Sequence, residues 1–330
     1  MLTKLFNYDK VDDMKRIILI SITIISICAT NASAFWIWTP ETNKWINPKY
    51  AVKETPKEQL EYGLEFFNVQ EYKKAINELE KLLKHYPRAM EAPKAQWYIG
   101  ESFEKMNKPY KAFQEYQKII GKYPFSDLSP VVVERQYKIG EKMLLTPSTN
   151  HFVTTLTGGE YDVIDVFRTV IKNAPYGNYA AVSQYKIGLY LAEKKMYSEA
   201  RDGLEKVIND YPDSEWVKAA RYQIALVDVE RSVGPAYDQK ITQAAAEEFE
   251  DFIKTYPDAQ LSQKARSEIA QLREKEAENN FLVAEFYQKQ KDYESAKIYF
   301  SSIIDEFPAS LWAVKSLEQI KIIEKKCKGK

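Results

Sequence analysis

The stretch ARDGLEKVINDYP, residues 200–212, contains the pattern that decides the fold of this chain. Its apolar residues stand three or four positions apart, as Leu204 and Val207 do, and charged residues fill many of the positions between them. Side chains at these intervals share one face of an α-helix, which is the face that packs against a neighbour. Pro212 then ends the helix, because proline has no backbone N–H and disfavours a helical conformation at the residue before it.

The same pattern occurs six times along the 330-residue chain, each time with a small or β-branched residue twelve positions before a proline. The six pairs are Ala75 and Pro87, Ala112 and Pro124, Val163 and Pro175, Ala200 and Pro212, Ala245 and Pro257, and Ala296 and Pro308. A fixed period of this kind is the signature of a helical repeat array, in which each helix pair stacks on the next. The sequence therefore predicts an all-α fold that serves binding rather than catalysis.

A glycine stands in the middle of the first helix of several pairs. These glycines are Gly63, Gly100, Gly140 and Gly188. Glycine inside a helix costs about 1 kcal/mol relative to alanine, so its repeated use needs a structural reason. We expect two helices to cross closely at these positions, which gives the glycines a role in packing and not in ligand binding.

The helical array is expected to cover residues 55–324. It begins at Thr55-Pro56, a helix N-cap followed by proline at the first helical position. It forms either one continuous solenoid or two halves, 55–175 and 176–324. A basic tail, residues 325–330, follows it.

The last helix of the array is expected to cap it. A terminal helix must cover the apolar side of the last repeat and present a polar side to water. The polar outer face predicted for residues 310–324 consists of Lys315, Glu318 and Lys321.

The N-terminus has the three parts of a secretory signal peptide. The basic pair Lys15-Arg16 precedes the apolar run of residues 17–27, and the small-residue motif Ala32-Ser33-Ala34 follows. We therefore interpret residues 1–34 as a signal peptide that is cleaved after Ala34. The alternative is an uncleaved membrane anchor.

Cys28 offers a different processing site. A lipoprotein signal ends in a cysteine that becomes the acylated first residue of the mature chain. The residue before Cys28 is Ile27, whereas such signals carry a small residue there. Lipidation at Cys28 and cleavage after Ala34 remain two alternatives for an exported chain.

The segment 35–54 is rich in tryptophan and contains Trp36, Trp38 and Trp45. It lacks helical periodicity, and its prolines favour an extended conformation. Two interpretations of the tryptophans stay open: they cap the apolar side of the first repeat, or they hold the chain near a membrane.

The composition excludes several classes of function. Lysine plus arginine and aspartate plus glutamate each number 47, so we expect no general electrostatic attraction for nucleic acid or for an anionic membrane, which leaves only a local patch as an alternative. The two histidines of the chain, His85 and His151, have no further histidine or cysteine at metal-ligand spacing. No nucleophile–base motif or phosphate-binding loop is recognisable. We expect no enzymatic activity, no cofactor, no metal and no nucleic-acid partner.

The repeats carry a resemblance to known families. A helix pair with glycine or alanine in its first helix, alanine in its second and proline after it resembles the tetratricopeptide repeat over most of residues 56–324. This resemblance implies a right-handed superhelical solenoid of about six tetratricopeptide-like helix pairs with a C-terminal capping helix. The 37-residue spacing of Pro87 and Pro124, and the motif Tyr-Pro-x-Ser-x-x-x-x-Ala that begins at Tyr211, are similar to the BamD family of outer-membrane assembly lipoproteins.

The resemblance to the BamD family implies a function. The chain would be a non-catalytic, protein-binding scaffold in outer-membrane β-barrel assembly, in the periplasm at the inner face of the outer membrane. Its partners would be β-barrel assembly subunits and unfolded segments of outer-membrane proteins. Two alternatives are a soluble periplasmic tetratricopeptide adaptor that coordinates cell-envelope machinery, and a holder of exported unfolded chains.

Aligning the first helices by their glycines indicates a candidate binding groove. Three residues before each glycine, or before its counterpart Ala225, stand Leu60, Trp97, Tyr137, Tyr185 and Tyr222. In a tetratricopeptide array this face lines the concave surface, where rigid aromatic rings suit a peptide ligand. Phe67 extends the face, and Glu101, Glu104 and Glu141 add acidic rims. The alternative is that these aromatic residues pack between adjacent repeats.

Overall fold

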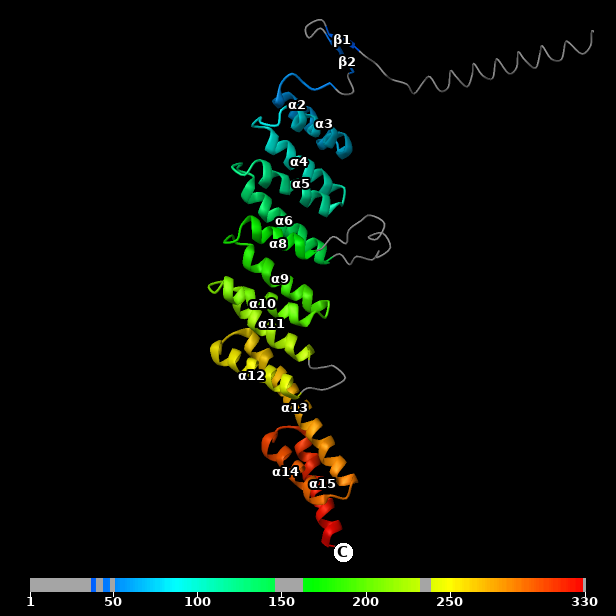
Figure 1. Ribbon diagram of the computed structural model, residues 1–330, viewed down its shortest axis with the longest axis vertical. Helices are drawn as coiled ribbons and strands as arrows, with labels where there is room; N and C mark the ends of the chain where they lie inside the picture. The colour runs from blue at the N-terminus through cyan, green and yellow to red at the C-terminus, as the bar shows by residue number, and fades with distance from the viewer. Residues whose placement is uncertain (1–36, 40–43, 48–50, 146–162, 232–238, 329–330) are drawn as a thin grey trace, which may run out of the picture. The chain divides into compact units, whose positions relative to one another are not determined.

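The computed structural model describes residues 37–39, 44–47, 51–145, 163–231 and 239–328 (Figure 1). The chain divides into two compact units, Met1–Met106 and Asn107–Lys330, and each is described by itself. The predicted signal peptide, with Cys28, lies outside the described residues.

The first unit contains a short hairpin and three helices among its described residues. The strands are β1 (Ile37–Thr39) and β2 (Lys44–Ile46), and the helices are α2 (Pro56–Asn68), α3 (Tyr72–His85) and α4 (Ala92–Lys105). Helix α2 begins where the sequence predicts, and the Thr55 side chain accepts a hydrogen bond of 3.2 Å from the backbone N–H of Glu58. The strands pair antiparallel, whereas the sequence predicts only an extended segment.

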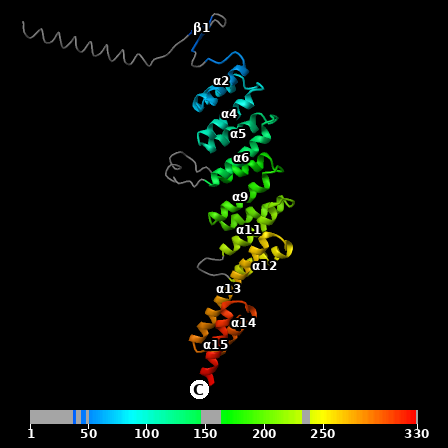
Figure 2. The same ribbon diagram turned by 180° about the vertical axis from the view of Figure 1, so that it is seen from behind.

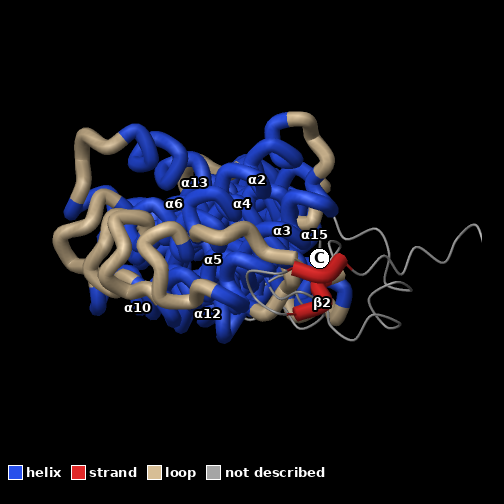
Figure 3. The backbone as a smooth tube through the Cα atoms, turned by 90° about the horizontal axis from the view of Figure 1, so that it is seen from above, coloured by secondary structure: helices blue, strands red, loops and turns tan. Residues whose placement is uncertain are grey.

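The second unit contains ten helices in the part of the chain that the structure describes. They are α5 (Pro109–Lys122), α6 (Ser129–Leu145), α8 (Val163–Asn173), α9 (Ala180–Glu193), α10 (Tyr197–Asp210), α11 (Trp216–Arg231), α12 (Gln239–Thr255), α13 (Gln260–Lys289), α14 (Tyr293–Glu306) and α15 (Leu311–Lys328). Successive helices of this unit lie side by side in both views (Figures 1 and 2). Helices make up most of the described chain, and turns and loops connect them (Figure 3), which confirms the predicted α-helical array.

The Tyr-Pro pairs end the second helix of a repeat, as predicted. Tyr86, Tyr123 and Tyr211 are C-cap residues, and their backbone N–H groups still donate to the carbonyls four residues earlier, at 2.7–3.2 Å. Their carbonyls accept hydrogen bonds of 3.0–3.1 Å from the backbone N–H groups three residues later. The residues after each proline therefore form a turn that leads into the next helix.

The glycines of the first helices lie where two helices cross. A β-carbon added to Gly63 would lie 2.7 Å from Cδ2 of Leu79, and one added to Gly188 would lie 2.6 Å from Cγ of Leu204. Both distances are shorter than real carbon–carbon contacts, so alanine would not fit without a shift of the neighbouring leucine. The predicted packing role is confirmed for Gly63 and Gly188, and also for Gly140, where an added β-carbon would lie 2.8 Å from Phe167.

The capping helix α15 differs from its prediction. Its inner face buries Ala313 and Ile323, and the predicted residues Lys315, Glu318 and Lys321 are exposed. The prediction of a polar outer face is nevertheless wrong in part, because four large apolar side chains are also exposed. They are Leu311, Val314, Leu317 and Ile322, and they are 71, 61, 47 and 41% exposed.

Candidate functional site

The predicted groove residues of the first unit lie on α2 and α4. Leu60 is buried in the core of the unit. The half-buried residues are Phe67, Trp97, Glu101 and Glu104. The ring of Phe67 packs edge-on against Tyr72 and Tyr98, with centroid distances of 5.6 and 5.0 Å. Leu60 therefore serves packing, while the half-buried side chains keep surface that a ligand can touch.

In the second unit, Tyr137 and Glu141 form a hydrogen-bonded pair on α6. The Tyr137 hydroxyl donates to Oε1 of Glu141 at 2.8 Å, and the Tyr137 ring stacks on Tyr179 with centroids 4.8 Å apart. Oε1 of Glu141 also lies 3.5 Å from Nζ of Lys186 on α9. Burial raises the pKa of Tyr137, and the Glu141 carboxylate raises it further. The protonated hydroxyl thus helps to position a carboxylate that remains partly open to solvent.

The two other aromatic residues of the predicted groove, Tyr185 and Tyr222, pack against the next helix. The ring of Tyr185 lies 5.1 Å from Trp216, and that of Tyr222 lies 5.6 Å from Phe249. Burial raises the pKa of both hydroxyls. The rings of Tyr137, Tyr185 and Tyr222 thus contact other helices, as the packing interpretation expects.

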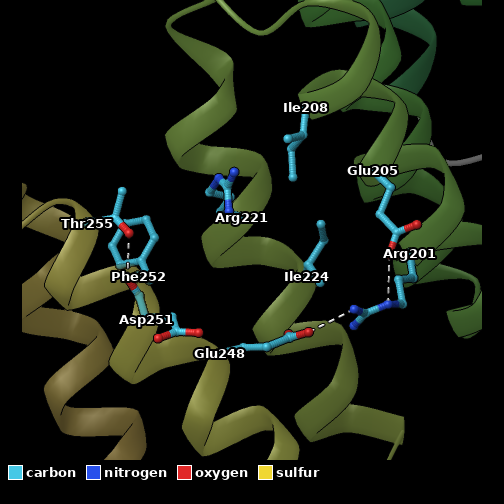
Figure 4. Close-up of a pocket in the computed structure, with 9 residues that line it drawn as sticks. All are labelled: Arg201, Glu205, Ile208, Arg221, Ile224, Glu248, Asp251, Phe252 and Thr255. Carbon is cyan, nitrogen blue, oxygen red and sulfur yellow. Dashed lines mark hydrogen bonds and ion pairs between the residues drawn. The ribbon is translucent and has the colours of Figure 1, made fainter.

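A cleft that the sequence reasoning missed lies on α10, α11 and α12 (Figure 4). Its apolar lining consists of Ile208, Ile224 and Phe252, and its polar lining consists of Arg201, Glu205, Arg221, Glu248, Asp251 and Thr255. The volume is about 210 Å³. Small-molecule sites measure about 300–1,000 Å³, so this cleft suits one or two side chains of a protein partner.

Arg201 is fully engaged by the carboxylates around it. Its Nε lies 3.0 Å from Oε1 of Glu205, and its Nη2 lies 2.7 Å from Oε1 of Glu248. Its Nη1 donates to Asp228, which is buried. Burial lowers the pKa of Arg201, but Glu248, together with the other two carboxylates, raises it overall. Arg201 therefore stays charged and joins three helices.

Arg221 is the free cation of the cleft. Its side chain is exposed and makes no hydrogen bond or ion pair with any described residue. In Figure 4 it stands between the side of the cleft that carries Phe252 and the side that carries Ile208. Oε2 of Glu248 is buried and lacks a hydrogen-bond partner within the described chain. The cleft thus combines apolar side chains with one unpaired guanidinium and one unpaired acceptor.

The repeat register contains a signal that identifies this cleft. Four residues before the glycine of the first helix, four of the repeats carry a glutamine: Gln59, Gln96, Gln136 and Gln184. Gln59 and Gln184 each donate to a backbone carbonyl of the second helix, at 2.9 and 2.8 Å. Arg221 occupies this position in the fifth repeat, so the short amide link between the helices is missing there.

In the third repeat the same position belongs to what we call the amide layer, formed by Gln117 on α5, Gln136 on α6 and Asn173 on α8. Gln136 donates to Gln117 at 2.7 Å, and Asn173 donates to the side-chain oxygens of both, at 2.7 and 2.8 Å. Two repeats further along the chain, the residues at the same three repeat positions are Glu205, Arg221 and Thr255, in the same order. All three line the cleft.

Comparisons with known proteins agree with the repeat pattern. A family model described as outer membrane lipoprotein (YfiO) matches residues 154–328, just over half of the chain. The chain belongs to this family. The resemblance to the BamD lipoproteins is thereby confirmed, and the matched stretch contains the whole cleft. A tetratricopeptide-repeat model matches residues 94–126, and no curated protein matches the chain. In the described part of this family member, no helix is both long and apolar enough to cross a membrane.

Three solved structures are similar to this family member at low sequence identity. A tetratricopeptide-repeat protein from Parabacteroides merdae is 14% identical over 82% of this chain and 100% of its own, with a TM-score of 0.34. The C-terminal part of a repeat protein from Cytophaga hutchinsonii is 16% identical over 80% of this chain and 88% of its own, with a TM-score of 0.37. PilW, a type IV pilus biogenesis factor, is 14% identical over 81% of this chain and 100% of its own, with a TM-score of 0.29.

Proposed function

We propose that this protein is a non-catalytic, protein-binding scaffold in outer-membrane β-barrel assembly, in the periplasm at the inner face of the outer membrane. The observation that carries the proposal is the family match over residues 154–328, which includes all helices from α8 to α15. The partners are β-barrel assembly subunits and unfolded segments of outer-membrane proteins. Arrays of tetratricopeptide repeats supply extended surfaces for such partners.

The cleft on α10–α12 is the surface best suited to anchor a partner. The half-buried side chain of Ile208, above the buried Ile224 and Phe252, offers contact for one apolar side chain, and such anchors dominate the free energy of protein binding. The unpaired guanidinium of Arg221 offers a site for a carboxylate beside that side chain. The partner segment therefore presents an aliphatic or aromatic residue next to an acidic one.

Two residues predicted for the groove supply further contacts, one in each compact unit. Trp97 on α4 and Glu141 on α6 keep part of their side chains open to solvent. A half-exposed indole gives a partner apolar contact area at a small cost in conformational entropy. Replacing either Trp97 or Glu141 by alanine should lower the amount of bound partner without unfolding the array.

Affinity purification from cross-linked cells tests the proposal. The tagged wild-type chain should recover β-barrel assembly subunits. Arg221→Glu reverses the free charge, and Thr255→Trp fills the cleft from its exposed rim, so each should lower recovery about tenfold, equivalent to a loss of about 1.4 kcal/mol. Arg168→Glu on α8 is the matched control, because Arg168 is 65% exposed and lies outside the cleft.

The outcomes separate the two parts of the proposal. If the wild-type chain recovers no assembly subunit, the assignment to β-barrel assembly fails. If it recovers them and both cleft variants recover as much as the control, the assembly role stands and the cleft is not the anchor.

A further inference from the structure

The N-terminal hairpin carries two tryptophans directly opposite each other. Strands β1 and β2 pair antiparallel with Trp38 facing Trp45, and the ring centroids lie 5.6 Å apart with the planes inclined at 58°. A cross-strand aromatic pair stabilises a two-stranded hairpin, which is otherwise marginally stable in water. The pair therefore helps to hold the hairpin together.

Both indoles of this pair remain open to solvent. Trp38 is 42% exposed and Trp45 is 63% exposed, with helices α2 to α4 of the same unit in place. A cap on the first repeat would bury them, so the exposure favours the membrane interpretation of these tryptophans. Exposed clusters of large apolar side chains mark surfaces that bind something.

The position of the hairpin in the chain indicates a lipid surface. The chain belongs to a family of outer membrane lipoproteins, and its apolar run of residues 17–27 ends ten residues before Ile37. An extended chain covers at most about 3.6 Å per residue, so the hairpin begins within about 36 Å of Ile27. The hairpin is therefore within reach of a bilayer in both alternatives that keep this part of the chain, an uncleaved anchor formed by residues 17–27 and a lipid on Cys28.

The chemistry of the pair agrees with this position. Tryptophan favours the interface of a bilayer because its ring is apolar while its N–H finds acceptors among the lipid headgroups. A carbohydrate fits less well, since a sugar stacks on a flat and open aromatic face. The planes of the Trp38 and Trp45 rings are instead inclined at 58°, so the two rings do not form one flat platform.

We propose that the Trp38–Trp45 face of the hairpin lies in the headgroup region of a lipid bilayer. It holds the beginning of the first unit at the membrane surface, as a contact separate from the signal segment. This contact involves lipid alone, so it does not depend on the protein partners of the proposed function.

Quenching of tryptophan fluorescence by brominated lipid tests this contact in the full chain. The protein is reconstituted into vesicles of phosphatidylethanolamine and phosphatidylglycerol whose acyl chains carry bromine close to the headgroup. Trp38 and Trp45 are two of the six tryptophans, so they account for up to about a third of the emission. The quenched share should fall by that amount in the double variant Trp38→Phe/Trp45→Phe, in which the aromatic pairing is kept.

A matched double variant serves as the control. Trp216→Phe/Trp312→Phe also removes two indoles, but both lie in helices of the second unit, on α11 and α15. Because Trp216 and Trp312 are not expected to touch lipid, this variant should lose only emission that brominated lipid does not quench. The emission that the lipid does quench should stay as in the wild type. Circular dichroism checks that each variant retains the helical content of the wild type.

Two results would overturn the proposal. The first is a wild-type chain whose emission brominated lipid does not quench. The second is a Trp38→Phe/Trp45→Phe variant that keeps the full quenched emission of the wild type. If this variant also has a lower unfolding midpoint, the pair is assigned to capping the first repeat. None of these results bears on the recovery of assembly subunits, so the two proposals fail separately.

Discussion

The amide layer and the cleft occupy equivalent positions of the repeat, yet the first is closed and the second is open. In the amide layer, Gln136 is fully buried and takes part in side-chain hydrogen bonds of 2.7 and 2.8 Å with Gln117 and Asn173. In the cleft, the equivalent Arg221 is exposed and pairs with no described residue. One position of the repeat therefore serves packing in one place and stays free for a partner in another.

The difference follows from what the side chains can donate and accept. Each amide both donates and accepts, so three amides satisfy one another without water. In the cleft, Glu205 already accepts from Arg201 at 3.0 Å, and Thr255 donates to the backbone carbonyl of Asp251 at 2.8 Å. Arg221 cannot accept a hydrogen bond, so it cannot replace an amide that both donates and accepts, and its exposed guanidinium remains in water.

The largest expected effect is the loss of the amide layer. Gln136→Ala removes two hydrogen bonds, so Gln117 loses a donor and Asn173 loses an acceptor in a buried site. This should lower the free energy of unfolding by about 2 kcal/mol. Arg221→Ala changes the equivalent position by less than about 0.5 kcal/mol, because it touches neither a core contact nor a hydrogen bond. Urea unfolding followed by circular dichroism measures both. If Gln136→Ala and Arg221→Ala lower the free energy of unfolding by the same amount, the closed amide layer and the open cleft do not differ in their contribution to stability.

The next effect comes from converting the cleft into an amide layer. The triple variant Glu205→Gln, Arg221→Gln and Thr255→Asn should form one or two new hydrogen bonds and raise the unfolding free energy by about 1 kcal/mol. The new amide oxygen at position 205 still accepts from Arg201. Recovery of partners should fall at the same time, because the space for the anchor is filled. A variant that is more stable and still recovers its partners fully would contradict the role of the cleft.

The helix ends and helix crossings were predictable because they depend on local chemistry. Proline after Tyr86 ends α3 wherever the rest of the chain lies, and Gly188 is needed because another helix backbone comes close. The pairing of Trp38 with Trp45 was not predictable in this way. The residues between the strands lack the Asn-Gly or Asp-Gly dipeptide that marks a tight hairpin.

The cleft could not be read from local sequence for a different reason. It exists because Arg201 binds Asp228 and Glu248, which lie 27 and 47 residues further along the chain. Several carboxylates compete for one guanidinium, and the packing of α10, α11 and α12 decides which of them it meets. The repeat register gives the position of Arg221 but not its exposure. The packing of α11 on α12 also buries Tyr222, which therefore does not open to a groove.

A smaller effect concerns the pH dependence of the buried carboxylate behind the cleft. Burial raises the pKa of Asp228, and the repulsion of Glu248 and Glu205 adds to this, while Arg201 and Arg231 oppose it. The folded state thus holds the proton of Asp228 more tightly than the unfolded state does. The corresponding stabilisation is present below the ordinary carboxyl pKa and is lost as pH rises through the raised pKa of the folded state.

Asp228→Asn isolates this effect because an amide does not titrate. As pH rises from about 4 to about 7, the unfolding free energy of the wild type should fall relative to that of Asp228→Asn, by no more than about 1.4 kcal/mol per pH unit. Burial also raises the pKa of Glu276, but that group is present in both proteins and cancels in the difference. A difference that stays constant over this range, or moves the other way, would mean that Arg201 fully compensates the burial.

The smallest expected effect tests whether the free charge of Arg221 is used for binding. Arg221→Gln should leave stability within about 0.5 kcal/mol of the wild type, because no partner within the described chain is lost. An exposed ion pair with a partner carboxylate contributes about 0.2–1 kcal/mol, so recovery should fall by less than about fivefold at low salt. Salt screens such a pair, so the difference from the wild type should vanish near 1 M salt. Arg168→Gln removes an exposed guanidinium outside the cleft and should change recovery at neither salt concentration.

If Arg221→Gln lowers recovery equally at low and high salt, the side chain of Arg221 contributes apolar contact through its aliphatic stem and not through its charge. The acidic residue inferred for the partner would then be absent, and the cleft would recognise its anchor through apolar contact alone, chiefly with the half-buried Ile208.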